Sequence, residues 1–454
     1  MLEDDRSILD KARELYGIHC SERAKLDVVR RYYKGIQARP MAIPRDSPQE
    51  VIVMARSSRV NIMPIVVNTL VQSTFVDGFR SRDESEDSEV WRAWQANRMD
   101  ARQTAIHRAT FEYGTAYAIV RPGRDGGLPI IKGRSPRSLT ALYGDDPDWP
   151  VWALERLGGG EFCLIDDEAF YTVYLGGNER ARDEVVEIEP HVFEVAPVVR
   201  YLDEADLDAD DEVEPDDDIV TCDEEPPLRG QVTPLMPLQD QIDTTTFGLH
   251  IAQHYSAFRQ RFIIGWTAQS ERELLRASAS KVWTFDDDPE SVKVGEFEQT
   301  NLEGYIKSRE ASLRHAATLS QTPVHELIGE LVNLSAEALA AAEAGHERKV
   351  GERKTLLGES HEQTLSLCGK LMGVEVPNDA QVVWRDTSAR AFAATVDGLG
   401  KLSQMLGVPV EELWERIPGV TKQDVDRWRD RAQRGDSFDR LAEALRRQSE
   451  PQAA

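Results

Sequence analysis

The chain is poor in cysteine, and the few cysteines it has are far apart. They are Cys20, Cys163, Cys222 and Cys368, and no two of them form a CxxC pair. Zinc ribbons and disulfide-stapled domains are recognised by closely spaced or patterned cysteines. This spacing therefore excludes both kinds of scaffold and favours a reducing compartment.

Long apolar runs are also missing. No N-terminal stretch resembles a signal peptide, and the most apolar segment, NIMPIVVNTLVQSTFV, is interrupted by Pro64, Asn68 and Gln72. A membrane-spanning helix needs about 20 consecutive apolar residues, and a secretory signal needs a continuous apolar core. We expect a protein that is made and used in a cytosol, without a membrane partner.

Positive charge is in short supply. The 54 lysines and arginines face 80 acidic residues, which gives a formal net charge of −26. Proteins that hold DNA tightly neutralise its phosphates with basic side chains. The balance therefore excludes a tight grip on DNA, although an acidic wall can face DNA without holding it. Between Asp203 and Glu225 more than half of the residues are acidic and none is basic, which predicts a solvated insertion without a core of its own.

The common motifs of nucleotide and hydrolase chemistry are absent. The sequence has no GxxxxGK[ST] loop, no GxGxxG after a strand and no GxSxG turn. ATPases, dinucleotide enzymes and serine hydrolases thus lose their main sequence support. No catalytic, cofactor-binding or metal-binding residue is assigned, and we expect neither a cofactor nor an enzyme activity.

One histidine pair has the spacing of metal ligands. His250 and His254 lie four residues apart, which places them on one face of a helix, as in some zinc sites. Ile251 follows the first histidine where a metalloprotease has its glutamate base, and the sequence offers no third ligand. Helix-packing or exposed histidines fit this pattern better than zinc. His346 and His361, fifteen residues apart further along the chain, are interpreted as polar-face residues of a long helix.

The acidic insertion carries a second metal pattern. Asp206, Asp208 and Asp210 have the spacing of the first ligands of a calcium loop. The sixth position is Asp211 rather than glycine, and the twelfth is Asp217 rather than a bidentate glutamate. A plain acidic insertion fits better than a calcium site.

Hydrophobic periodicity predicts an α+β chain that is mainly α-helical. Helices are expected at 5–37, 60–75 and 88–113, with Trp91, Trp94, Met99 and Ile106 on a buried side, followed by a β-rich region at 116–202. Over the whole chain the pattern predicts seven segments: a region 1–237, a helix 238–261, strands around a short helix at 262–300, a helix 301–319, an interruption 320–334, a long helix 335–373, and a strand with two or three helices at 374–454.

Two of these helices flank the small insert at 262–300. Their apolar stripes are Phe247, Ile251, Tyr255 and Phe258 on the first helix and Leu302, Ile306 and Leu313 on the second. An insert that is entered and left by helices tends to lie at the tip of an antiparallel helix pair. We predict that these stripes pack the pair.

Several stretches, in this order, resemble the portal proteins of tailed bacteriophages, in particular the siphophage type found in phages of actinobacteria. The matching segments are YYKGIQARP, NIMPIVVNTLVQSTFVDGF, ATFEYGTAYAIV, PLQDQIDTTTFGLHIAQHYSAFRQRFIIG, NLSAEALAAAEAGHERKVGERKTLLGE and VVWRDTSAR. The resemblance covers roughly residues 25–430. One departure is Phe258 and Arg259, where the family usually has a proline before its "qR" pair.

The resemblance implies a subunit with a helical and β-rich wing at 1–237, an antiparallel stem helix pair at 238–261 and 301–319, and a small α/β clip at 262–300. A tunnel loop at 320–334, a long helix at 335–373 and a helical crown at the C-terminus complete it. It also implies a ring, typically of twelve copies, that forms the channel for DNA packaging and ejection at one capsid vertex.

The partners implied by the resemblance are further copies of the chain, the terminase large subunit, a head-completion or adaptor protein, the major capsid and scaffolding proteins, and double-stranded DNA in the channel. The expected location is the virion, after assembly in the host cytoplasm. A metal-dependent enzyme and a different virion scaffold component remain as alternatives.

Within the implied tunnel loop, Val324, Leu327 and Ile328 are expected to act as anchors, and His325, Glu326, Glu330 and Asn333 are candidates to face DNA. The long helix that follows begins with an alanine-rich stretch from Ala336 to Ala344, which Ser335 can cap. Alanine favours helix but buries little area. This stretch is therefore suited to close approach by a helix of a neighbouring subunit, or else to exposure to solvent.

Overall fold

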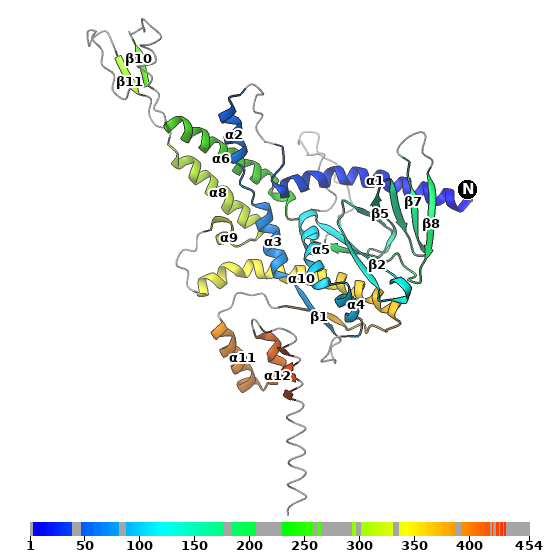
Figure 1. Ribbon diagram of the computed structural model, residues 1–454. Helices are drawn as coiled ribbons and strands as arrows, with labels where there is room; N and C mark the ends of the chain where they lie inside the picture. Colours follow the sequence, from blue (N-terminus) through cyan, green and yellow to red (C-terminus); the bar gives the residue numbers. More distant parts are fainter. Residues whose placement is uncertain are drawn as a thin grey trace, which may run out of the picture. The chain divides into compact units, whose positions relative to one another are not determined.

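The computed structural model describes residues 3–38, 47–80, 88–176, 183–205, 229–257, 261–264, 293–296, 301–329, 336–385 and 392–417, and residues 420, 424, 425, 427–429, 431 and 432. Helices and strands are mixed along the chain, as predicted (Figure 1). The chain forms two compact units. The first comprises Met1–Asp27, Val67–Gln231 and Glu347–Ala454, and the second comprises Val28–Val66 and Val232–His346.

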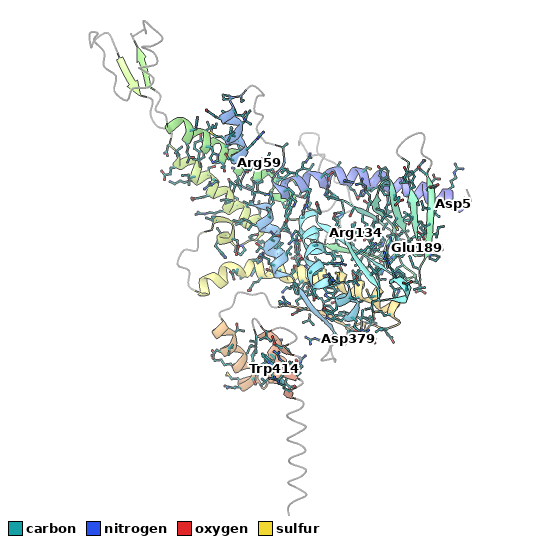
Figure 2. All side chains as sticks on the ribbon, viewed as in Figure 1. Asp5, Arg59, Arg134, Glu189, Asp379 and Trp414 are labelled. Atoms are coloured by element: carbon teal, nitrogen blue, oxygen red, sulfur yellow. The ribbon has the colours of Figure 1, made fainter. Side chains whose placement is uncertain are left out.

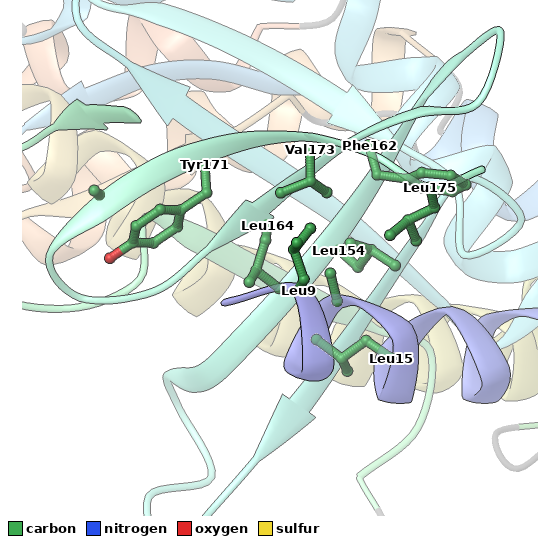
Figure 3. Packing of buried hydrophobic residues seen from close by; sticks show 10 residues of the cluster. Leu9, Leu15, Leu154, Phe162, Leu164, Tyr171, Val173 and Leu175 are labelled. Carbon is green, nitrogen blue, oxygen red and sulfur yellow. The ribbon is translucent and has the colours of Figure 1, made fainter. Parts of the chain in front are cut away.

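A five-stranded antiparallel sheet in the first unit is covered on one face by helix α1 (Glu3–Lys34). Its order is β4-β5-β6-β7-β8, with bounds Leu139–Tyr143, Pro150–Gly158, Glu161–Ile165, Ala169–Tyr174 and Glu184–Pro190. Leu9, Ala12 and Leu15 share one face of α1 and pack on Leu164 and Val173 of the sheet (Figure 3). Apolar residues recur every three positions on the helix and every two positions on the strands, so each element buries its apolar side against the other.

The other face of this sheet packs on a three-stranded antiparallel sheet of order β3-β2-β9. The bounds are Ile130–Arg134 for β3, Thr115–Arg121 for β2 and Val198–Leu202 for β9. Ile119 and Val198 lie in one core cluster with Cys163 and Phe170 of the larger sheet. In the first unit α1, the five-stranded sheet and the three-stranded sheet therefore form successive layers.

A buried carboxylate ties the two sheets together. Glu155 of β5 is fully buried and accepts hydrogen bonds from Arg134 Nε at 2.5 Å and Arg121 Nη2 at 3.4 Å. Arg121 also lies 3.7 Å from a carboxylate oxygen of Glu189 on β8, and Arg134 and Glu189 are labelled in Figure 2. Since a buried charge without a partner is strongly destabilising, the two arginines are what permits a glutamate in this position.

The helix expected at 88–113 is divided into α4 (Trp91–Ala96) and α5 (Met99–Tyr113). The break falls at Arg98, whose φ is 53°. Asn97 beside it donates to the carbonyl oxygen of Pro129 at 2.7 Å and accepts from the backbone N–H of Ile131 at 3.0 Å. The Asn97 side chain thus fixes the start of β3, and the helix is interrupted at this point. The residues predicted to be buried are all buried: Trp91, Trp94, Met99 and Ile106.

The long helix α10 (Ala336–Met372) begins and ends within one residue of the predicted helix 335–373. From Glu347 onward it belongs to the first unit, where Leu357, Leu365 and Cys368 are buried. The strands β1 (Val76–Arg80) and β12 (Gln381–Trp384) pair antiparallel in the same unit. α10 is joined to this pair because Glu362 accepts a hydrogen bond from the backbone N–H of Val382 at 3.1 Å.

The interpretation of His361 as a polar-face residue is wrong, because the side chain is fully buried. Its Nε2 lies 2.8 Å from His107 Nε2, and its Nδ1 lies 3.0 Å from the hydroxyl of Tyr201. His107 Nδ1 lies 3.1 Å from the carbonyl oxygen of Thr74 and donates to it. His107 Nε2 is then the acceptor, His361 Nε2–H donates to it, and Tyr201 donates to His361. Burial lowers the pKa of His107 to about 4 and that of His361 well below its usual value.

The second unit contains α2 (Gln49–Ser57), a short 3₁₀ turn at Thr233–Leu235, α6 (Met236–Ala257), α8 (Glu303–Ser320) and α9 (Val324–Ile328), with an antiparallel pair of strands, β10 (Arg261–Ile264) and β11 (Lys293–Glu296). The two strands lie where the sequence predicted strands in the insert, and residues 265–292, with the short helix expected there, lie outside the described residues. The helix expected to reach 261 ends at Ala257, and Arg261 already begins β10.

Near the N-terminus two helical predictions changed in detail and one helix was missed. The first helix ends at Lys34, where Gly35 adopts a φ of 67° that favours glycine. The helix expected at 60–75 is α3 (Met63–Ser73). α2 was not predicted, although Pro48 directly before it is typical of a helix start.

The described residues 392–417 of the first unit are mainly helical. α11 (Phe392–Leu406) ends before Gly407, whose φ is 68°, and α12 (Val410–Leu413) begins after Pro409. A 3₁₀ turn at Trp414–Arg416 follows, and the rings of Trp414 and Trp428 lie 6.0 Å apart. Among the residues that the structure describes, no helix has both the length and the apolar character needed to cross a bilayer.

Candidate functional site

The helix pair α6 and α8 is the frame of the candidate site. The two helices pack against each other, and β10 and β11 lie between them in the chain (Figure 1). Gly248 on α6 faces Tyr305 on α8, and a Cβ at position 248 would lie 2.9 Å from Tyr305 Cε1. Tyr305 is in the first turn of α8, and the segment that precedes α6 also contacts α8. The helices are therefore antiparallel, and glycine permits their close approach.

The buried faces of the pair overlap only partly with the predicted stripes. On α6 the buried residues include Ile242, Thr246 and Leu249, and on α8 they include Ala316 and Ala317. The predicted residues are distributed as follows: Leu313 is buried, Phe247, Ile251 and Leu302 are half-buried, Ile306 is 39% exposed, and the side chains of Tyr255 and Phe258 lie outside the description. Ile242 and Leu249 are seven residues apart, a repeat that could have identified the buried face of α6.

Polar side chains anchor the beginning of α6 within the second unit. Asp243 is buried and accepts hydrogen bonds from Gln37 Nε2 at 3.0 Å, from Gln239 Nε2 at 2.9 Å and from the backbone N–H of Val60 at 3.1 Å. Burial raises the pKa of Asp243, and the hydrogen bonds from Val60 and Gln239 oppose the rise. α6 is thus fastened to the segments that follow α1 and precede α3, a connection between positions too distant in sequence for a periodicity argument to find.

The interruption predicted at 320–334 begins with a tight helix end. Gln321 has a φ of 51°, in the left-handed region, and terminates α8. Thr322 N–H donates to the carbonyl oxygen of Ala317 at 3.0 Å, which satisfies one of the open carbonyls of the last turn. Pro323 then precedes α9, a five-residue helix that was not predicted.

Two of the four DNA-facing candidates can be placed. His325 has 17% of its side chain exposed and Glu326 has 49% exposed, with 3.8 Å between His325 Nε2 and a carboxylate oxygen of Glu326. His325 also lies 3.9 Å from a carboxylate oxygen of Glu343 on α10. Glu330 and Asn333 lie outside the described residues. α9 therefore presents Glu326 to its surroundings and turns His325 toward α10.

The expected anchors of this segment differ in burial. Leu327 is buried at 9% exposure and Ile328 is half-buried, whereas Val324 is 45% exposed and does not anchor the segment within this chain. A further contact comes from α10, because His346 Nδ1 lies 3.2 Å from the carbonyl oxygen of Gln321. The turn between α8 and α9 is therefore held from the N-terminal part of α10.

Metal-binding geometry was tested at the positions singled out in the sequence. His250 and His254 are both half-buried on α6, and His254 Nε2 lies 3.4 Å from a carboxylate oxygen of Glu50 on α2. Within the described ranges, no three His, Cys, Asp or Glu side chains come together as metal ligands would. The calcium-like pattern from Asp206 to Asp217 lies outside these ranges.

Comparison of the sequence with models of known protein families identifies the family of this chain. The sequence model of the family described as phage portal protein, SPP1 Gp6-like, matches residues 13–437. This chain belongs to the phage portal protein family. The match spans both compact units, including the helix pair, the strands between them and α10. The resemblance stated from the sequence is thereby confirmed, and a portal function is favoured over a metal-dependent enzyme or a scaffold.

Two curated portal proteins have related sequences. The portal protein of Mycobacterium phage D29 is 26% identical over 387 residues, which cover 82% of this chain and 77% of that protein. The portal protein of Mycobacterium phage L5 is 25% identical over 386 residues, with the same two coverages of 82% and 77%. Both relatives come from phages of mycobacteria, in agreement with the resemblance to portal proteins from actinobacterial phages.

Solved structures with a similar trace come from gene transfer agent particles. A chain from the virion of a native particle has a TM-score of 0.48 and 12% identity, covering 84% of this portal chain and 97% of its own length. A chain from the neck of a native particle computed with C12 symmetry has a TM-score of 0.44 and 13% identity, with coverages of 84% and 97%.

Proposed function

We propose that this portal chain assembles into a ring of twelve copies around a central channel at one vertex of a phage capsid. DNA enters the capsid through this channel during packaging and leaves through it during ejection. The observation that carries the proposal is the family match over residues 13–437. The antiparallel α6 and α8 pair, with its strand-containing tip, is consistent with the stem that the family resemblance implies.

The parts of the subunit are proposed as follows: residues 1–237 form the wing, 238–261 and 301–319 the stem, 262–300 the clip, 320–334 the tunnel loop, 335–373 the long helix, and 374–454 a wing strand and crown helices. In a closed ring each copy must offer two different faces that fit each other by rotation. The stem residues predicted from the sequence remain candidates for one such face, and the exposure of Ile306 at 39% supports a contact outside its own chain.

Within the channel, His325, Glu326, Glu330 and Asn333 are proposed to face double-stranded DNA. Phosphate-binding side chains would hold a moving duplex in place, whereas an acidic lining repels it and lets it slide. Glu326 supports this assignment because about half of its side chain is exposed at 49%. The portal chain itself performs no bond chemistry in this proposal, so the energy for DNA movement comes from a partner.

The proposed partners are the terminase large subunit, which docks on the clip during packaging, and a head-completion or adaptor protein, which replaces it afterwards. The major capsid and scaffolding proteins surround the wing. The ring is therefore a virion component that is assembled in the bacterial cytoplasm.

Electron microscopy of the purified chain tests the central claim. Class averages are expected to show rings with a central hole and a symmetry that can be counted. A monomer that remains stable across protein concentrations from low micromolar to several hundred micromolar would overturn the proposal.

Charge reversal tests the DNA-facing assignment. Glu326→Lys and Glu330→Lys are expected to slow or stall packaging of DNA into proheads, because a basic side chain would bind the passing phosphates. Glu375→Lys is a matched control, since Glu375 is exposed and lies between α10 and β12. If the first two variants package at the rate of the control while rings still form, those residues do not line the channel.

A further inference from the structure

The chain passes between its two compact units at four points, and two of these points lie beside a buried cluster of charge. Gln231 is the last residue before the second unit begins at Val232, and Glu347 is the first residue of α10 that belongs to the first unit. Lys349 and Arg353 follow within two turns of that helix. The chain therefore leaves the first unit after Gln231 and re-enters it at Glu347, and both points are close to the same side chains.

Four side chains form this cluster, and all four belong to the first unit. Arg353 Nε donates to Asp203 Oδ1 at 2.9 Å, and Gln231 Nε2 donates to Asp203 Oδ2 at 2.5 Å. Lys349 Nζ donates to Gln231 Oε1. Their exposures are 1% for Asp203, 5% for Arg353 and 8% each for Gln231 and Lys349. The neutral amide of Gln231 thus bridges a carboxylate and an ammonium group, and α10 supplies both cations.

The backbone beside the cluster is fixed on the end of α5. Asp203 N–H donates to the carbonyl oxygen of Gly114 at 3.0 Å, and Gln231 N–H donates to that of Phe111 at 2.8 Å. Gly230 approaches so closely that a Cβ there would lie 2.5 Å from Gly114 N. Asp203 and Gln231 are consequently held side by side, and any larger residue at position 230 would displace them.

The cluster carries an electrostatic cost. Burial raises the pKa of Asp203 to about 6, against the attraction of Arg353 and Lys349. Burial also lowers the pKa of Lys349 to about 8, with Asp203 opposing and Arg353 reinforcing the change. Apolar side chains of similar size often stabilise a fold as well as such a cluster does, and the best-supported use of buried charge is to select one arrangement over others.

We propose that Asp203, Gln231, Lys349 and Arg353 form a latch that fixes the exit at Gln231 and the return along α10 in one relative position. While the four side chains are bonded to one another, the segment around Gln231 and the part of α10 around Arg353 move together. When the latch is open, α10 is free to shift against Gln231 without disturbing the layers of sheet. The inference concerns the single chain and does not depend on ring formation.

Hydrogen exchange of the purified full-length chain, followed by mass spectrometry, tests the latch. Arg353→Met removes the cation bonded directly to Asp203, and the double variant Asp203→Asn with Arg353→Met removes both members of that pair and leaves Lys349, bonded to Gln231, as the one charge of the four side chains. Arg348→Met, an exposed position on the same helix, is the matched control. Amides of 229–235 and of 343–353 are expected to exchange about tenfold faster together in both latch variants, with 361–372 unchanged.

Three outcomes would overturn the proposal. They are unchanged exchange in the double variant, faster exchange at 343–353 with 229–235 still protected, and an equal increase throughout the first unit, which would mean general loss of stability. If Arg353→Met does not fold, the double variant carries the test alone. Electron microscopy of the unmodified chain reports separately on the ring, so an absence of rings there would contradict the proposed function and not the latch.

Discussion

Helix α10 is continuous, but its residues before Glu347 belong to the second unit and those from Glu347 onward belong to the first. The two parts differ in composition and in the contacts that they make. From Glu347 onward, polar side chains of the helix make buried hydrogen bonds to β9 and its neighbours, through Arg353, Ser360, His361 and Thr364. Before Glu347 most residues are alanine, and Glu343 lies near His325 and His346 near Gln321. The comparison indicates that the second part is specified by contacts within its own chain. Contact of the first part with a neighbour in the ring is a proposal that the variants below test.

The largest expected effect is a cavity in the second part. Leu357 is fully buried, so Leu357→Ala should lower the free energy of unfolding by about 2–5 kcal/mol, since it removes packing that the core cannot refill completely. Glu343→Ala in the first part should change it by less than about 0.5 kcal/mol. Denaturant unfolding of both variants measures the difference. Similar losses would remove the contrast between the two parts.

Low pH should destabilise the second part of α10 through His361. The unfolded chain protonates His107 and His361 below about pH 6.5, whereas burial holds the folded pKa of His107 at about 4 and that of His361 lower still. Stability is therefore lost as the pH falls from about 6.5 toward 4, by about 1.4 kcal/mol per pH unit for each histidine. Asp203 acts in the opposite sense between about pH 6 and 4, because its folded pKa is raised.

The contribution of the histidines is measured by the slope of the free energy of unfolding against pH. His361→Gln should flatten that slope between pH 6 and 5 relative to the unmodified chain, whatever its effect on stability at pH 7. Denaturant titrations at half-unit intervals of pH provide the measurement. An unchanged slope would show that His361 is protonated to the same degree in the folded and unfolded chain.

A smaller effect is expected from one hydroxyl group. Ser360 Oγ donates to the carbonyl oxygen of Arg200 on β9 at 2.8 Å, and Ser360→Ala should cost about 1 kcal/mol because that bond is lost. Thr355 is a control on the same helix, since its exposed hydroxyl donates to the carbonyl oxygen of Gly351 within the helix itself. Thr355→Ala should be close to neutral in the same unfolding experiment. A cost for Thr355→Ala equal to that of Ser360→Ala would argue against a specific bond to β9.

The smallest effect on the single chain should come from the alanine-rich part. Ala340→Lys is expected to change the free energy of unfolding by less than about 0.5 kcal/mol and yet to reduce the fraction of rings, because a long charged side chain prevents close approach of a neighbouring helix. Light scattering after gel filtration measures the assembly. Rings that form normally would favour the other interpretation of the alanines, exposure to solvent.

Sequence reasoning was most accurate where the cause was local. The limits of α10 follow from an absence of proline and from Gly373, whose φ is 67°, and these features are written in adjacent residues. The break between α4 and α5 was missed because its cause, the bonding of Asn97 to β3, joins residues more than thirty positions apart. The burial of His361 was missed for the same reason, since its partners come from α5 and β9.

The candidate site shows the same limit. The order of helix, strands and helix around the insert could be predicted. The predicted stripe of α6 matched its buried face only in part, because several elements contact α6 and the repeat of Ile242 and Leu249 was overlooked. The sharing of α1, α3 and α10 between two units also left no sign in the sequence. Periodicity describes one helix at a time and carries no information about which half belongs to which core.

The adjacency of Asp203 and Gln231 has a consequence for the length of the segment between them. Its two ends are held side by side by bonds to Phe111 and Gly114, so residues can be added or removed there without changing the distance that the chain must span. The entropic cost of a longer connection rises only slowly with its length. Positions 206–228 are therefore suitable for variation in evolution, or for insertion of an affinity tag.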